Sequence, residues 1–483
     1  MPFLTVPQLL DSAVARFADA PALVTADRSE TFGELGANVS AVARTLQERG
    51  VKSRDRVLIA APNSIALVHT WLGSIVAGAI PAAVNPDSKQ AELDYFSKDL
   101  DPRLTLLEQD LDSLPPPSWG RVGVGAAAVD PLDTAAIVYT SGTTSRPKGV
   151  MVRHAAYTEA GSSFPQWLGL RGPQRLWACL PMFHINAQAY SLMSSLSYGF
   201  PLALSSKFHA STFWQEARDL EVTSVNMVGA MLQFLAHRPA TSFQPVSLKT
   251  IYAAPGPQPE ERAQLEARFG VRIITGFGMS ENPFGCIETE SSRGKPNSIG
   301  RPRQPVSKAF TNRLRILRSD GAQAAVGETG ELCFQNPVMT PGYWNAPEIT
   351  EKALSEGWLH SGDAGYVDQE GDVFLTGRYK EMIRRRGENI APAEIEDVLA
   401  GHPAVYAAAV IGIAAGLEEE EVVAVVVPKE GATVDEAGLK AFAAERLAAF
   451  KVPTRIELRA ELPMTATHRV AKDVLRKEYA RPG

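Results

Sequence analysis

One short segment of the chain gathers groups of the kind that bind phosphate. Residues 139–149 contain several serines and threonines, two glycines and Lys148. The hydroxyls can donate to phosphate oxygens, the glycines let the backbone approach a ligand closely, and the lysine adds a mobile positive charge. The segment is not a Walker A loop, because Pro147 and Gly149 occupy positions where that motif has a glycine and a serine or threonine. The candidate phosphate-binding residues are Thr140, Ser141, Gly142, Thr143 and Thr144.

Residues 276–281 could bind the other parts of a nucleotide. They follow the strand-like run 271–274 and are expected to form a turn that carries an aromatic ring, a hydroxyl and a carboxylate. Phe277 can stack on adenine and Ser280 can reach a phosphate. Glu281 can hold Mg²⁺, which prefers a carboxylate together with substrate phosphates. Gly278 and Met279 complete this candidate cofactor-binding segment.

An acid and an arginine further along the chain suit a ribose. Residues 361–363 are expected to form a tight turn that presents Asp363 to two ribose hydroxyls, and Arg378 follows fifteen residues later. Each has an ordinary alternative, since Asp363 could end a turn and Arg378 could form a surface ion pair. Their occurrence together and in this order, after a phosphate-loop candidate, favours a nucleotide site.

The elements that must position these residues follow a clear pattern. The apolar run 135–139 predicts a buried strand directly before the phosphate-loop candidate, and the runs 56–60 and 80–84 predict strands separated by a helix. Helices that alternate with short apolar strands indicate a largely parallel sheet. From about residue 311 shorter β segments with glycine turns predict a β-rich subdomain.

The last hundred residues form a separate pattern of α+β type. Pro392 is suited to open a helix, strands are expected at 405–413 and 422–427, and a helix at 434–448. The glutamates at 418–421 are expected in a solvated turn. The predicted fold class is therefore α/β, with a large N-terminal domain of mixed sheets flanked by helices plus a β-rich subdomain, and a small α+β C-terminal domain. The predicted domains are 1–379 and 380–483.

Bulk composition narrows the functional classes. The chain has 483 residues, more than one hydrophobic core usually supports, and a formal net charge of −6. That charge argues against nucleic acid or an anionic membrane as a partner. The start lacks a signal-peptide pattern and no apolar run reaches about 18 residues, so we expect a cytoplasmic protein without a membrane span. Cys179, Cys286 and Cys333 are expected to be buried, reduced thiols.

Taken together, the segments resemble the adenylate-forming superfamily of acyl-CoA synthetases, nonribosomal-peptide adenylation domains and luciferases. The resemblance covers about residues 32–472. It implies that 139–149 is the phosphate loop, that 276–281 binds adenine and Mg²⁺, and that Asp363 and Arg378 bind the ribose. It also implies that domain 1–379 binds ATP and the acid substrate. The small C-terminal domain 380–483 would be mobile and would rotate about a hinge at Lys380 between two half-reactions.

The implied chemistry has two steps. A carboxylate attacks the α-phosphorus of Mg·ATP to give an acyl-adenylate and pyrophosphate, and a thiol then displaces AMP. The implied cofactors are ATP, Mg²⁺ and CoA, or the phosphopantetheine of a carrier protein. The implied partners are ATP, a small carboxylic acid, and CoA or a carrier protein, in a monomer or homodimer that binds no nucleic acid.

The chain departs from the superfamily near its C-terminus. Arg469 stands where a catalytic lysine is usual, and a guanidinium is not interchangeable with an ammonium. Three interpretations stay open: Arg469 bridges carboxylate and phosphate oxygens, Lys472 acts in its place, or adenylation is slow. The candidate catalytic residues are Lys148, Glu281, Arg469, Lys472 and His184.

The resemblance also suggests which residues line the acid pocket. His184 borders the acyl pocket or gates ATP in related ligases, and its ordinary alternative is a histidine satisfied near a helix start. The candidate pocket residues are His184, Asn186, Asn226, Met227, Ala254, Gly276 and Phe284. Their polar members indicate a hydroxylated, amino-bearing or aromatic acid rather than a long alkyl chain.

The leading hypothesis is an ATP-dependent acid–thiol ligase that transfers a small acyl group to CoA. Three alternatives remain at this point. The acyl group could pass to a carrier protein, an unusual oxyanion such as nitrite could be adenylated for a non-thiol acceptor, or the chain could be a catalytically impaired nucleotide-binding homologue.

Overall fold

The computed structural model describes residues 3–480, except 112–113, 115–128, 141–146, 240–245, 386–387, 391, 417–418 and 465–469. These residues form two compact units. The large unit comprises Met1–Thr140, Pro147–Leu314 and Phe334–Leu359, and the small unit comprises, among the described residues, Arg315–Cys333 and the chain from His360 onward. The domain boundary after residue 379 stays a prediction.

The main sheet of the large unit is built around parallel strands. Strands β10 (Ser224–Met227), β11 (Thr250–Ala253) and β12 (Arg272–Met279) run parallel to one another. Beyond β10 the sheet continues through β8 (Leu176–Ala178) and β9 (Leu202–Leu204) to β1 (Pro21–Val24) and β2 (Ser29–Thr31). Beyond β12 it continues antiparallel through β13 (Asn282–Ile287) and β14 (Ser298–Pro302).

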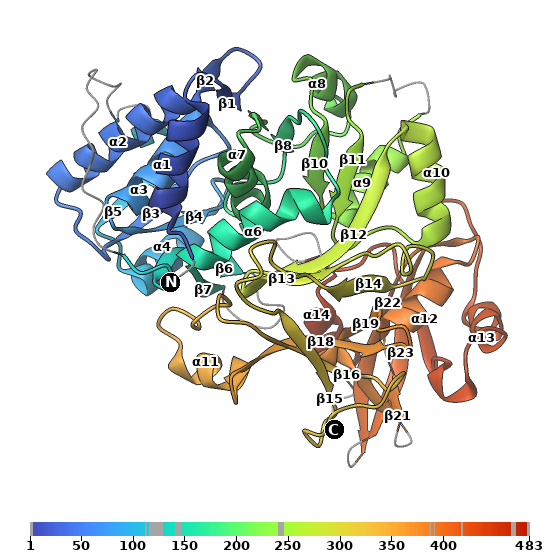
Figure 1. The fold of residues 1–483 in the computed structure, drawn as a ribbon. Helices are drawn as coiled ribbons and strands as arrows, with labels where there is room; N and C mark the ends of the chain where they lie inside the picture. The colour runs from blue at the N-terminus through green and yellow to red at the C-terminus, as the bar shows by residue number, and fades with distance from the viewer. Residues whose placement is uncertain are drawn as a thin grey trace. The chain divides into compact units, whose positions relative to one another are not determined.

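A second, fully parallel sheet of the large unit confirms two predicted strands. It consists of β3 (Arg56–Ala60), β4 (Ile80–Val84) and β5 (Leu104–Leu107). Helices α2 (Phe32–Glu48) and α3 (Ile65–Val76) pack against each other, and Figure 1 shows them beside this sheet. Thr31 caps α2 with a capping box and Ser64 caps α3, so local hydrogen bonds fix where both helices begin.

The phosphate-loop candidate joins two strands of a hairpin. β6 (Thr134–Thr140) and β7 (Lys148–Arg153) pair antiparallel, with Thr140 opposite Lys148. Residues 135–139 are buried, as predicted for the strand before the loop. Residues 141–146, with Ser141, Gly142, Thr143 and Thr144, lie outside the described residues.

Further helices flank the sheets of the large unit. Helix α10 (Pro259–Phe269) has the predicted bounds and lies beside β12 (Figure 1). The others are α1 (Val6–Phe17), α4 (Gln90–Leu100), α5 (Glu108–Leu111), α6 (His154–Trp167), the π-helix η1 (Asn186–Leu192), α7 (Met193–Tyr198), α8 (Phe213–Asp219), α9 (Gly229–Ala236) and α11 (Pro347–Ala353). Cys179 and Cys286 in this unit, and Cys333 in the small unit, are buried free thiols, which confirms that prediction.

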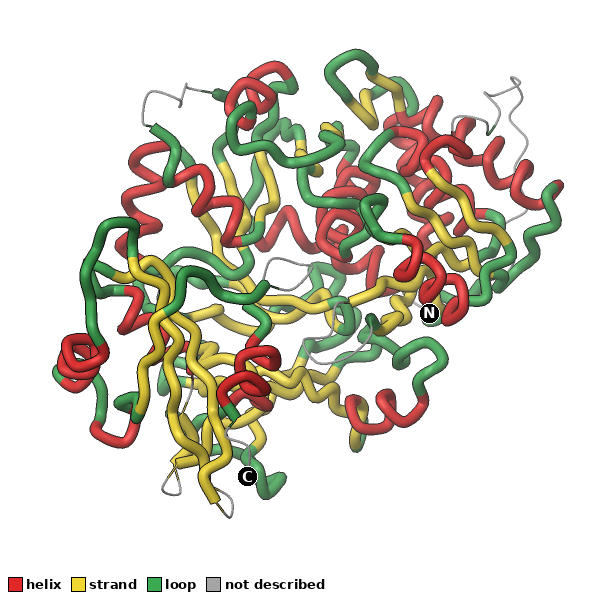
Figure 2. Tube along the Cα trace, turned by 180° about the vertical axis from the view of Figure 1, so that it is seen from behind, coloured by secondary structure: helices red, strands yellow, loops and turns green. Residues whose placement is uncertain are grey.

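The small unit combines β-ribbons with an α+β layer. Strands β18 (Trp358–Val367) and β19 (Val373–Arg378) pair antiparallel, and β20 (Ile383–Arg385) pairs with β21 (Glu388–Ile390). The longest hairpin, β22 (Val405–Gly416) with β23 (Glu419–Pro428), is seen at lower left in Figure 2. The remaining elements at or after residue 313 are β15 (Arg313–Leu317), β16 (Gly330–Gln335), β17 (Leu354–Ser355), η3 (Tyr379–Glu381), α12 (Pro392–Ala400), α13 (Glu436–Ala444), η4 (Ala449–Lys451), β24 (Arg455–Leu458) and α14 (Lys472–Tyr479).

Two expected turns are wrong and a third is confirmed only in part. Residues 361–363 lie within β18, and Glu419–Glu421 belong to β23. Residues 276–279 continue strand β12, so that only Ser280 and Glu281 form the expected turn, between β12 and β13. Glycine, serine and acidic residues favour turns locally, but in each case pairing with a neighbouring strand satisfies the backbone and overrides that preference. No described helix is long and apolar enough to cross a membrane.

Candidate active site

Tyr343 links two of the predicted catalytic residues in the large unit. Lys148 begins strand β7, and its Nζ atom lies 5.7 Å from the centre of the Tyr343 ring. The Tyr343 hydroxyl donates a hydrogen bond of 2.7 Å to Oε1 of Glu281. Three separate segments thus bring an ammonium, a phenol and a carboxylate together beside the strand ends that flank the phosphate-loop candidate.

Backbone contacts fix this arrangement. The Thr340 N–H donates to the Glu281 carbonyl at 2.8 Å, and the Trp344 N–H donates to the Gly149 carbonyl at 2.7 Å. The Thr340 hydroxyl donates to the Met151 carbonyl at 2.7 Å. Gly149 allows the close approach, because a Cβ there would lie 3.3 Å from Cβ of Trp344 and still closer to a side chain of β6. The segment 340–344 is therefore fastened to strand β7 and to Glu281 at once.

The Glu281 carboxylate is a candidate ligand for Mg²⁺. It is only 8% exposed, and its Oε1 is held by the Tyr343 hydroxyl. Its Oε2 has no hydrogen bond or ion pair with any residue that the structure describes. Magnesium usually binds proteins through one or two carboxylates and completes its shell with substrate phosphates and water. A carboxylate with one oxygen held by the Tyr343 hydroxyl and the other without a partner among the described residues fits that pattern.

Strand β12 and the turn after it carry the predicted adenine and phosphate residues. Phe277 is half-buried and its ring stacks on Phe334, with 6.1 Å between centroids and 18° between planes. Gly278 is exposed, whereas Met279 and Ser280 are partly exposed. Because side chains alternate along a strand, Phe277 lies on the opposite face from Gly276 and Gly278.

The predicted acid-pocket residues lie on neighbouring elements of the large unit. Asn186 is in the π-helix η1, and its buried Oδ1 has no hydrogen-bond partner among the described residues. Asn226 on β10 instead donates to the Ser191 hydroxyl at 3.2 Å. His184 is exposed just before η1, and Ala254 follows β11. The pocket candidates that are buried are Asn226, Met227, Gly276 and Phe284.

The predicted ribose residues form a pair in the small unit. Asp363 and Arg378 are directly opposite each other on β18 and β19, and Nε of Arg378 lies 3.2 Å from Oδ1 of Asp363. The Asp363 side chain is 14% exposed and that of Arg378 is 42% exposed. Lys380 follows in the 3-10 turn η3, and its role as a hinge stays a prediction.

Lys472, the alternative catalytic cation, is held by two glutamates of the small unit. Its Nζ lies 2.7 Å from Glu396 and 3.3 Å from Glu381, and its side chain is 15% exposed. Both carboxylates would have to release it before it could reach a substrate. Arg469 lies outside the described residues, so the choice between the two cations stays open.

Comparisons with known proteins identify the family. Residues 10–344 match the AMP-binding enzyme family, and residues 394–469 match its C-terminal domain. The chain belongs to the AMP-binding enzymes. It is an adenylate-forming enzyme close to the acyl-CoA ligases, a type that uses ATP and CoA.

Similar proteins support this membership along the whole chain. The AMP-binding enzyme described here is 31% identical to a sulfoacetate–CoA ligase of Cupriavidus necator, with 97% of each chain covered. It is 32% identical to a 2-succinylbenzoate–CoA ligase of Geobacillus kaustophilus, covering 99% of this chain and 98% of that one. Its fold matches ATP-bound MatB from Rhodopseudomonas palustris with a TM-score of 0.87, at 24% identity and 99% coverage of both chains.

Sequence reasoning missed Tyr343 in this AMP-binding enzyme. The signal available was a Pro341-Gly342 pair followed by two aromatic residues. Such a pair marks a turn, and Gly342 indeed has a φ of 141°, where a Cβ would clash with Thr350. Nothing in the sequence showed that the turn delivers a phenol to Glu281.

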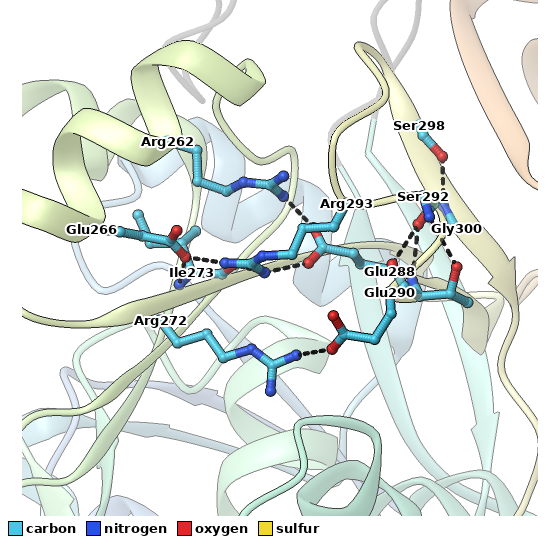
Figure 3. Close-up of polar contacts among 11 residues, drawn as sticks. Arg262, Glu266, Arg272, Ile273, Glu288, Glu290, Ser292, Arg293, Ser298 and Gly300 are labelled. Atoms are coloured by element: carbon cyan, nitrogen blue, oxygen red, sulfur yellow. Dashed lines mark hydrogen bonds and ion pairs between the residues drawn. The ribbon is translucent and has the colours of Figure 1, made fainter.

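A buried ion-pair network braces the start of β12 (Figure 3). Glu288 accepts from Arg262 and, at 2.6 Å, from Arg293, which also pairs with Glu266 of α10. The side chains of Arg262 and Glu288 are 8% and 5% exposed. The Ile273 N–H donates to Glu266 at 2.7 Å, so the network also holds the backbone of β12.

Proposed function

We propose that this AMP-binding enzyme is an ATP-dependent ligase that joins a small carboxylic acid to CoA. The observation that carries the proposal is the link from Lys148 through Tyr343 to Glu281, at the base of a hairpin loop rich in hydroxyls. Such an arrangement suits the neutralisation and alignment of a polyphosphate, which are the chief requirements of nucleotidyl and phosphoryl transfer.

In the first step, a carboxylate oxygen of the acid attacks the α-phosphorus of ATP. The bond from that phosphorus to the bridging oxygen breaks, and the electron pair leaves with pyrophosphate. Lys148 stabilises the charge that develops on the departing phosphates. Glu281, oriented by the Tyr343 hydroxyl, would hold Mg²⁺, which would supply further charge neutralisation there.

The remaining residues position the nucleotide. Phe277 offers a ring face for adenine, and Asp363 offers carboxylate oxygens to the ribose hydroxyls. The Arg378 guanidinium, 3.2 Å from Asp363, holds that carboxylate in place. No protein nucleophile is needed, because the substrate carboxylate and the CoA thiol are the nucleophiles.

In the second step, the CoA sulfur attacks the acyl carbonyl carbon and AMP leaves with the electron pair of the broken C–O bond. We propose that residues 380–483 rotate about Lys380 between the steps. In this scheme Glu381 and Glu396 release Lys472 when its charge is needed for adenylation.

A product assay tests the proposal. Purified protein is incubated with Mg·ATP and a panel of small acids, with and without CoA, and pyrophosphate, AMP and thioester are measured. We expect acid-dependent pyrophosphate release and, with CoA, stoichiometric thioester. If no acid in the panel causes pyrophosphate release, the ligase function is contradicted. If pyrophosphate is released but no thioester forms with CoA, CoA is contradicted as the acceptor.

A variant connects the assay to the site. Lys148→Met should lower the rate of pyrophosphate release at least about tenfold, because one transition-state charge contact is lost. Lys207→Met is the matched control. Lys207 is an exposed lysine that pairs with Asp87, and its removal should leave the rate unchanged.

A further inference from the structure

A buried arginine lies against strand β12, which carries the predicted acid-pocket residue Gly276. Arg303 is 1% exposed and follows strand β14. The centre of its guanidinium lies 5.0 Å from the Trp167 ring and 5.2 Å from each of the Tyr190 and Tyr252 rings. Three aromatic rings therefore surround a full positive charge.

This charge has no counter-charge in the part of the chain that the structure describes. Nη1 donates to the Tyr190 hydroxyl at 2.6 Å and to the Pro283 carbonyl at 3.1 Å, and Nη2 donates to the Tyr252 hydroxyl. All three acceptors are uncharged groups. Burial raises the pKa of Tyr190 above its usual value, so its hydroxyl stays neutral at pH 7. Burial likewise raises the pKa of the nearby Cys286 thiol to about 12.

The guanidinium also has unused donors. It carries five N–H groups, and three of them are used in the hydrogen bonds above. The Nε–H is buried without a partner, and one N–H of Nη2 has no acceptor among the described residues. A buried, uncompensated charge costs several kcal/mol in general, whereas a carboxylate can accept two parallel bonds from a guanidinium.

The cluster is built from the segments that carry the acid-pocket candidates. Tyr190 shares helix η1 with the pocket candidate Asn186. Tyr252 lies near the end of β11, and the pocket candidate Ala254 follows that strand. On β13, Pro283 precedes the pocket candidate Phe284. The Arg303 cluster and the predicted acid pocket thus both use η1, the end of β11, and β13. The pocket candidate Gly276, on β12, also faces Arg303.

Two glycines of β12 face the cluster formed by Arg303, Tyr190 and Tyr252. A Cβ on Gly276 would come within van der Waals overlap of Nη2 of Arg303, and a Cβ on Gly278 would lie 2.8 Å from the Tyr190 hydroxyl. Gly278 is exposed whereas Gly276 is buried. The guanidinium therefore lies behind bare backbone, close to a position on the strand that solvent reaches.

From this geometry we propose that Arg303 binds a second anionic group of the acid, so that the substrate is a short dicarboxylate or a sulfonated carboxylate. This inference rests on the proposed function. One carboxylate is activated by ATP, and the other anionic group pairs with the free N–H groups of Arg303 while Tyr190 and Tyr252 hold the guanidinium flat.

Pairs of acids that differ only in the second charge test the proposal. Succinate is compared with levulinate, in which a methyl group replaces one carboxylate oxygen, and sulfoacetate with methylsulfonylacetate. Malonate, glutarate and 2-succinylbenzoate extend the charged set. Binding is measured by calorimetry with Mg²⁺ and a non-hydrolysable ATP analogue, and kcat/KM is measured from pyrophosphate release.

At least one charged acid should bind about 30-fold or more tightly than its neutral partner, the lower range expected for a buried charge pair. Arg303→Met should remove that preference, and Arg303→Lys should retain part of it. Arg301→Met, a change at an exposed arginine two residues away, should leave it intact. The inference is overturned if the wild-type protein binds both members of every pair with equal affinity, or if it binds none of the charged acids.

The two proposals fail in different ways. A charge preference in binding that depends on Arg303, without pyrophosphate release from any acid, supports the anion site and contradicts the ligase function. Pyrophosphate release from neutral and charged acids alike supports the ligase function and refutes the anion site. Because wild-type preference is measured directly, its absence refutes the anion site whether or not the Arg303 variants fold.

Discussion

Replacing Tyr343 with phenylalanine removes one hydroxyl and leaves the ring that lies beside Lys148. That hydroxyl donates to Glu281 at 2.7 Å, and Glu281 is 8% exposed, so little water is available to replace the donor. A hydrogen bond to a charged group contributes about 1.5–3 kcal/mol. If that energy serves to orient the carboxylate for Mg·ATP, its loss lowers kcat/KM for Mg·ATP about 10- to 100-fold.

The assay separates the two half-reactions. Acid-dependent exchange of pyrophosphate with ATP reports adenylation, and conversion of preformed acyl-adenylate with CoA reports thioester formation. Tyr343→Phe should slow the first and spare the second, because the second uses neither Mg·ATP nor pyrophosphate. Tyr198→Phe is the control, since it removes a phenol that donates at 2.7 Å to the Ser162 carbonyl, a neutral acceptor.

A double-mutant cycle with Glu281→Gln tests the coupling itself. If Tyr343 acts through Glu281, the effects on adenylation should be far from additive, because the second change removes a contact that the first has already disabled. Additive losses in the cycle, or equal losses in both half-reactions, would refute the reasoning.

Three further predictions follow from the charged groups of the structure. Glu288→Gln should lower the free energy of unfolding, measured in urea, by about 3–5 kcal/mol, because it removes a buried charged partner from two arginines. The control Glu290→Gln, at a side chain that is 83% exposed, should change this free energy by less than about 1 kcal/mol. Equal effects of the two substitutions would contradict the argument. Burial lowers the pKa of His154 to about 4 from an ordinary 6.5, so the unfolded chain binds the proton first and stability should fall as pH drops from 6.5 toward 4. Urea titrations across that range should show a slope up to about 1.4 kcal/mol per pH unit in the wild type and a smaller one in His154→Asn, and parallel slopes would reject this assignment. Asp363→Ala should weaken binding of Mg·ATP about tenfold or more by calorimetry, through the loss of charge-assisted hydrogen bonds to the ribose; unchanged affinity would remove Asp363 from the nucleotide site.

Regular elements with caps and uninterrupted apolar runs were predictable from the sequence. Strands 56–60 and 80–84 and helix 259–269 have the expected bounds, since each is defined by residues within or next to it. The segments 276–279 and 361–363 were assigned wrongly as turns. Their glycines favour turns locally, and only a partner strand distant in the chain reveals the ladder to which they belong.

The residues of the candidate site also fall into those that the sequence could suggest and those that it could not. Residue type, order and the family resemblance were enough to select Lys148, Glu281 and Asp363 as candidates, and their roles stay predictions. Tyr343 and Arg303 were missed because each acts through residues at least 20 positions away in sequence. An isolated tyrosine or arginine predicts neither its burial nor its partners.

The two faces of strand β12 offer different surfaces to the two substrates proposed to bind near it. Alternation along the strand sends Phe277 to the face where its ring stacks on Phe334, and leaves Gly276 and Gly278 toward Arg303 and Tyr190. A side chain at either glycine would displace the phenol or the guanidinium, so an aromatic residue between two glycines is the pattern that this geometry needs. If one face contacts adenine and the other the acid, a substitution at Gly276 should alter the choice of acid while leaving the affinity for ATP nearly unchanged, and Gly276→Ala measured against both ligands would separate the two faces.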